Sequence, residues 1–239
     1  MQGRLDSTAV IFGDFRFKDI EQELIDLQEL FKDLLVFANF SRNPILTGIP
    51  FENPIAIELF SPNKQLIIQI ANNRINILKN TQFDDTGKKT EYNDKEFLET
   101  AQDIQKRLLK HYKVTGSRIA YIINFCREDS EEVKNKLLND HLYKYSESFE
   151  WGARNAVREN FSINGKEEVI NIVTSINFYP ENLKITIGSN TIEIGGVMYN
   201  LDINTVPENI QTRVDENFIS EFYKKALELS NKIEGGYLW

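Results

Sequence analysis

The feature that most constrains the fold is the alternation of apolar and polar side chains in the last third of the chain. In residues 170–178 the apolar positions Ile170, Ile172 and Ile176 alternate with polar ones such as Asn171 and Asn177. A period of two places neighbouring side chains on opposite faces of a β-strand, so one face is buried. Turn-forming residues at 180–182, 188–190 and 195–196 divide the segment. We therefore predict a meander of four short strands over residues 170–203.

A second group of β-type runs occupies residues 55–60, 65–71 and 74–78. The last two are separated only by Asn72-Asn73, which suits a two-residue hairpin because asparagine tolerates positive φ. Residues 118–126 are apolar without alternation until Asn124, which is typical of a central strand covered on both faces. We expect an antiparallel meander in the first half and a central strand in the middle of the chain.

Three segments show the apolar spacing of amphipathic helices: residues 20–35, 93–111 and 218–233. Asn93 and Glu96 form a capping-box pattern at the start of the second. A shorter helix is predicted over residues 129–142, and residues 146–161 are left open between strand and loop. The predicted class is α+β, with mainly antiparallel sheets in two meanders covered by about three amphipathic helices. Two similar lobes, residues 1–115 and 116–239, are one organisation, and a single continuous domain is the other.

The charge balance argues against nonspecific nucleic-acid binding without excluding a local basic groove, and the single cysteine excludes two kinds of site. The chain has 36 acidic and 28 basic residues, a net charge of −8, whereas nonspecific nucleic-acid binding draws on clustered Lys and Arg. Cys126, the one cysteine, rules out an internal disulfide or a cysteine-based zinc site within one chain. No run approaches the roughly 20 apolar residues of a membrane helix, and the N-terminal residues lack signal-peptide features. We predict a cytoplasmic bacterial protein without a membrane partner.

The usual catalytic signatures are missing from the sequence. It has no phosphate loop, dinucleotide fingerprint, zinc-protease motif or nucleophile elbow, so no cofactor or metal is predicted. One catalytic alternative remains, because Glu58, Glu193 and Asp202 lie on predicted strands with lysines nearby. Such carboxylates hold the divalent metal of nucleases and phosphodiesterases. The sequence leaves the question of enzymatic activity open.

The strongest binding candidates are Trp151, Arg154 and Arg158. Tryptophan and arginine dominate the energetic centres of protein interfaces, although a core tryptophan with arginines that reach water is the alternative. Arg118 and Asn124 lie near the two ends of the predicted central strand. An unpaired buried asparagine costs about 1–3 kcal/mol, so Asn124 must be hydrogen-bonded or lie at an accessible strand end.

The order of the parts carries a family resemblance. A hairpin with Arg74 in its second strand precedes a helix opening near Phe97. A strand ending in Asn124 and an apolar strand ending in Asp202 then precede the terminal helix. This order resembles a sporadically distributed family of uncharacterised bacterial proteins over most of the chain. The resemblance implies an α+β fold of similar length without an established activity.

Two departures from the family pattern accompany the resemblance. Family members tend to have arginine-tyrosine-isoleucine-asparagine where this chain has Tyr121-Ile122-Ile123-Asn124, and a second acidic residue where Asn204 stands. If Asn124 and Asp202 have a role in the family, the resemblance implies the same role here. The patchy occurrence of the family implies genes that travel, such as those for phage defence, toxins or immunity.

The sequence as a whole favours a non-catalytic interaction subunit or regulator in a bacterial phage-defence or toxin–immunity system. Its acidic balance suits a basic protein partner or a second copy, because complementary charge accelerates encounter and sets register. A metal-dependent nuclease or phosphodiesterase is the first alternative. A small-ligand sensor with a pocket between the two lobes is the second.

Overall fold

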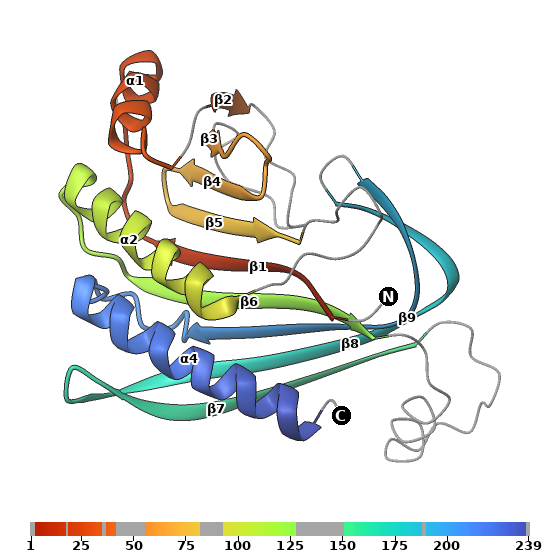
Figure 1. The fold of residues 1–239 in the computed structure, drawn as a ribbon. Helices are drawn as coiled ribbons and strands as arrows, with labels where there is room; N and C mark the ends of the chain where they lie inside the picture. Colours follow the sequence, from red (N-terminus) through yellow and green to blue (C-terminus); the bar gives the residue numbers. More distant parts are fainter. Residues whose placement is uncertain are drawn as a thin grey trace.

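The computed structural model describes residues 3–17, 19–34, 37–41, 56–81, 93–127, 151–187 and 190–237 (Figure 1). The strands are β1 (Gly3–Phe12), β2 (Phe37–Ser41), β3 (Ala56–Phe60), β4 (Leu66–Ala71), β5 (Arg74–Asn80), β6 (Arg118–Arg127), β7 (Trp151–Ile163), β8 (Lys166–Ile187) and β9 (Asn190–Thr205). The helices are α1 (Ile20–Leu30), α2 (Asp94–Tyr112) and α4 (Glu216–Tyr237). The predicted helix at residues 129–142 lies outside the described residues.

One antiparallel sheet contains all nine described strands. Their order is β2-β3-β4-β5-β1-β6-β9-β8-β7. Strands β1 and β6 pair from Gly3↔Cys126 to Phe12↔Arg118, so strands from before and after residue 115 share the sheet. The predicted α+β class is confirmed, with more sheet than helix. The described strands form one sheet and do not divide clearly into two meanders or lobes.

The C-terminal strands are longer than predicted. Strand β8 runs continuously through Pro180, and β9 runs through Gly195 and Gly196, where the sequence predicted breaks. The pairing of β8 with β9 shifts register between Tyr179 and Leu183, and such an irregularity accommodates a residue without an N–H group. The prediction of four short strands was therefore wrong. The hairpin at residues 72–73 is confirmed, since Ala71 pairs with Arg74.

The three helices lie against one face of the sheet (Figure 1). Odd-numbered residues of β6 point toward them. The ring of Tyr121 lies 6.4 Å from that of Phe97 on α2 and 6.3 Å from that of Tyr223 on α4. The apolar positions of β1, β3, β4, β5 and β9 join the same buried cluster. The core therefore lies between the helices and this face, and the even-numbered residues of β6 lie on the other face.

The start of helix α2 is fixed both by its cap and by the sheet. Asn93 Oδ1 accepts a hydrogen bond from the backbone N–H of Glu96 at 3.2 Å, which confirms the predicted cap. The next residue, Asp94, accepts a hydrogen bond from the Tyr121 hydroxyl at 2.8 Å and forms an ion pair with Arg4. These contacts tie α2 to β1 and β6.

Three further features of the described chain concern Cys126, residues 151–163 and the apolar character of the helices. Cys126 is buried. Residues 151–163, left open between strand and loop for most of their length, form strand β7 at one end of the described sheet order. None of the described helices has the length and apolar character needed to cross a membrane.

Candidate binding face of the sheet

Four of the five predicted binding residues lie on the face that the helices leave uncovered. Strand register shows this: Asn124 pairs with Asn200, and Ile122 pairs with Asp202. Arg154 and Arg158 pair with Ser175 and Asn171 of β8. Directly paired residues point to the same face of a sheet. We call this surface the polar face and define it by Asp6, Arg118, Asn124, Arg154, Arg158, Asn171, Asn200, Asp202 and Asn204.

A first chain of hydrogen bonds joins three strands across the polar face. Asn124 Nδ2 donates to Asp6 Oδ1 at 2.8 Å, and Asn200 Nδ2 donates to Asn124 Oδ1 at 2.8 Å. Burial raises the pKa of Asp6 to about 6, and the hydrogen bond from Asn124 and the charge of Arg4 oppose this only in part. Asn124 is therefore hydrogen-bonded on both sides, one of the two outcomes the sequence allowed.

A second chain runs from the middle of the polar face toward β7. Asn204 Nδ2 donates to Asp202 Oδ1 at 2.9 Å, and Asn171 Nδ2 donates to Asn204 Oδ1 at 3.3 Å. Arg158 donates from Nε to Asn171 Oδ1 at 3.1 Å and from Nη2 to Glu208 Oε1 at 2.5 Å. The chain leads from a largely buried carboxylate to an exposed guanidinium and holds both side chains in place.

The carboxylate of Asp202 interacts electrostatically with two arginines, Arg118 and Arg154. Burial raises the pKa of Asp202, whereas the bond from Asn204 and the charges of Arg118 and Arg154 lower it. Burial also lowers the pKa of Arg118, whose guanidinium lies 4.6 Å from the centre of the Phe12 ring. The polar face thus combines fixed acceptors in its middle with arginine donors around them.

Arg154 differs from the other polar-face arginines in its partners. It is exposed, and within the described part of the chain it makes no hydrogen bond or ion pair. Arg158 is exposed as well, but it is already held by Asn171 and Glu208. The β7 side of the polar face therefore presents one guanidinium with open hydrogen-bonding capacity beside a second one fixed in position. The side chain of Trp151, the fifth predicted binding residue, lies outside the described residues.

The three carboxylates of the nuclease alternative are not brought together. Glu58 lies on β3 and Asp202 on β9, with four strands between them in the sheet order. At about 4.8 Å per strand, that order separates them by about 24 Å. Glu193 lies nine residues from Asp202 on the same strand, about 30 Å at the usual rise. In the described ranges no three His, Cys, Asp or Glu side chains gather into a metal-binding group.

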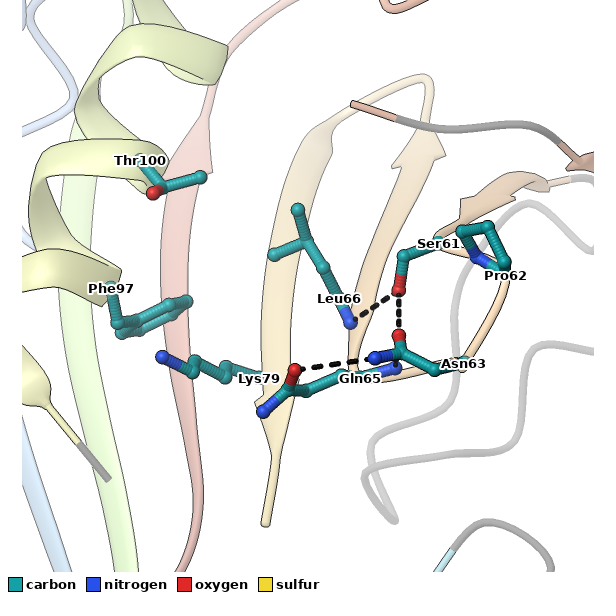
Figure 2. A pocket seen from close by; sticks show the side chains of 8 residues that line it. All are labelled: Ser61, Pro62, Asn63, Gln65, Leu66, Lys79, Phe97 and Thr100. Atoms are coloured by element: carbon teal, nitrogen blue, oxygen red, sulfur yellow. Dashed lines mark hydrogen bonds between the residues drawn. The ribbon is translucent and has the colours of Figure 1, made fainter. Parts of the chain in front are cut away.

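A separate pocket of about 370 Å³ lies on the helix side of the sheet (Figure 2). It opens between the turn from β3 to β4, strand β5 and the first turns of α2. Its lining residues are Ser61, Pro62, Asn63, Gln65, Leu66, Lys79, Phe97 and Thr100. Hydrogen bonds fix the turn, since the Leu66 N–H donates to Ser61 Oγ at 3.0 Å and the Gln65 N–H donates to Asn63 Oδ1 at 3.1 Å.

Comparison with known proteins adds no family assignment: no protein-family model matches the chain, and no curated protein matches it. The proposed function therefore rests on the fold and the polar face.

Sequence reasoning missed Asp6, Asn171 and Asn200 as members of the polar face. The signal for Asn171 and Asn200 was present, because each occupies a polar position between apolar ones in a strand. Asp6 had no such signal. Its place beside Asn124 follows from the pairing of β1 with β6, which joins residues more than a hundred positions apart.

Proposed function

We propose that this chain is a non-catalytic interaction protein that binds its partner through the polar face. The proposal rests on one observation: Arg118, Asn124, Arg154 and Arg158 share the helix-free face around Asp202. Arginine is enriched at the energetic hot spots of protein interfaces. We place the protein in the cytoplasm of a bacterium, as a subunit or regulator of a phage-defence or toxin–immunity system.

The net charge and the polar face act at different distances in this proposal. The net charge of −8 supports a basic protein partner, because long-range attraction raises the rate of encounter. Contact is then made by Arg154 and Arg158, which donate to carbonyl or carboxylate groups of the partner. Glu208, which is exposed beside Arg158, accepts from the partner's basic side chains.

The test is affinity purification of the tagged protein from its native host, followed by measurement of the partner's binding constant. The Arg154→Ala/Arg158→Ala variant is expected to weaken binding by about a hundredfold, since each hot-spot arginine contributes about 1–2 kcal/mol. The matched control is Lys32→Ala/Lys95→Ala, which removes two exposed cations from the helix side. Equal binding by the two double variants, or the absence of any co-purifying protein, would contradict the proposal.

The pocket on the helix side supports a second candidate function, that of a small-ligand sensor. Its volume falls in the usual range for small-molecule sites, about 300–1,000 Å³. Leu66 and Phe97 supply apolar surface, and Lys79 and Thr100 supply an ammonium and a hydroxyl group (Figure 2). This lining suits a small molecule with an apolar body and a carboxylate or phosphate. The predicted position between two lobes differs from the place of this pocket, between the β3–β4 turn and α2.

Thermal unfolding with a panel of aromatic carboxylates and nucleoside monophosphates tests the sensor function. A ligand that binds only the folded state raises the melting temperature in proportion to its concentration and affinity. The shift is expected to disappear in Lys79→Met and to persist in Lys95→Met, which removes an exposed lysine on α2. A shift that survives in Lys79→Met, or no shift with any member of the panel, would exclude this pocket as the sensor site.

A further inference from the structure

Strand β7 forms one end of the described sheet and lacks most of the features that usually protect such an edge. Natural edge strands are short, bulged, interrupted by proline, or charged, most often with lysine. Of these features β7 has only charge, from Arg154, Arg158 and Glu159. The opposite edge strand, β2, is 5 residues long, whereas β7 has 13 residues without proline or lysine. Its pairing with β8 keeps one register from Trp151↔Phe178 to Ile163↔Lys166. Its outer backbone edge is therefore long, regular and suited to pairing with another strand.

The surface of β7 is also exposed along most of its length. Every residue from 154 to 160 is exposed, and Val157 has 46 % of its surface accessible. Val157 is one of the few large apolar side chains in the described residues with such exposure. It lies at the midpoint of the strand, six residues from each end.

The sequence of β7 allows it to pair with β7 of a second copy of this chain. When a strand pairs antiparallel with its own copy around a two-fold axis, the residue on the axis meets itself. With the axis at Val157 all 13 residues pair, and Arg154 then lies opposite Asn160 and Arg158 opposite Ala156. With the axis at residue 156, Arg154 of each copy lies opposite Arg158 of the other. With the axis at residue 158, Arg158 lies opposite itself. Like charges directly opposite each other are destabilising.

We infer that two copies of this chain pair antiparallel through β7, with the two-fold axis at Val157. The central contact is then Val157 against its copy, flanked on that face by two Asn155–Glu159 pairs. The two sheets become one continuous sheet, and the two polar faces lie on the same side of it. Arg154 and Arg158 of both copies then flank the junction. A partner bound through the polar face could reach both copies, but the dimer does not depend on such a partner.

Disulfide trapping tests the axis directly. Directly opposed residues have Cβ atoms about 4.5–5.5 Å apart, so Val157→Cys is expected to form a disulfide-linked dimer under mild oxidation. Asn155→Cys is the matched control, because it is also exposed on β7 but lies opposite Glu159 of the copy. The native Cys126 is buried and is not expected to cross-link. Equal cross-linking of the two variants would overturn the inferred register.

Sedimentation equilibrium tests the dimer without any covalent bond. The unmodified chain is expected to sediment as a dimer. Val157→Lys places two like charges at the axis and is expected to raise the dissociation constant of the dimer at least about tenfold. Val169→Lys is the control, since Val169 is also an exposed valine but lies on β8 rather than on the edge strand. A monomeric wild type at all concentrations, or an equal effect of the two substitutions, would overturn the inference and leave the proposed partner binding untouched.

Discussion

At the scale of single residues, the middle of the polar face is held by partly buried groups that satisfy one another's hydrogen bonds. Asn124 is the clearest case. It lies in an otherwise apolar run, and its amide donates to Asp6 and accepts from Asn200. The sequence predicted that Asn124 would be either paired or accessible, because an unpaired buried amide is costly. It could not name the partners, since they come from strands that are distant in sequence.

The raised pKa of Asp6 gives a prediction with a definite sign. The pKa of Asp6 is about 6 in the folded state and has the ordinary value of 3.8 in the unfolded chain. Asp6 therefore stays protonated to a higher pH in the folded state than in the unfolded chain. The contribution of Asp6 to stability is therefore greatest at low pH and falls as the pH rises from about 4 to about 6. Asp6→Asn keeps the acceptor for Asn124 and removes the ionisation. We expect it to raise the free energy of unfolding at pH 8 by about 1–3 kcal/mol.

The measurement is urea unfolding of wild type and Asp6→Asn between pH 4 and pH 8. The stabilisation by Asp6→Asn should shrink toward zero near pH 4, where Asp6 is protonated in the folded wild type. Because Asp202 is present in both proteins, its own titration cancels in the difference. A difference that stays constant over this range would show that Asp6 does not titrate as its burial indicates.

At the scale of helices and strands, local signals predicted the elements whose patterns are complete within a few residues. The cap at Asn93 and the hairpin at residues 72–73 are confirmed for this reason. Strand β7 was not predicted, because residues 154–160 are exposed and have no buried face to produce alternation. The break at Pro180 was predicted wrongly, since the cost of a proline depends on the position of the neighbouring strand.

The N-cap of α2 provides a prediction at this scale. Asn93→Ala removes the acceptor for the Glu96 N–H group and is expected to lower the free energy of unfolding by about 1 kcal/mol. Asn93→Ser, which retains a capping oxygen, should restore most of that loss. Thermal unfolding of the three proteins measures the effect. Equal destabilisation by both substitutions would show that the asparagine acts through another contact.

At the scale of the whole molecule, the sequence predicted the class but not the arrangement. Periodicity shows which side chains share a face, but it carries no information about which strands become neighbours. The pairing of β1 with β6 is of this kind, and so is the separation of Glu58 from Asp202. The polar face could be predicted only as separate residues, because its assembly depends on strand order.

The central β1–β6 pair also predicts how the chain unfolds. Ile77 is fully buried on β5, and Ile77→Ala is expected to cost about 2–5 kcal/mol. Because one sheet and one core cluster span both halves, this loss should destabilise residues beyond 116 as much as those before.

Both tryptophans, Trp151 and Trp239, lie in the second half, so their fluorescence reports on that half alone. In urea, fluorescence and far-ultraviolet circular dichroism should give one coincident transition, shifted equally by Ile77→Ala. Two independent lobes would instead leave the fluorescence midpoint unchanged and produce a separate early transition in circular dichroism.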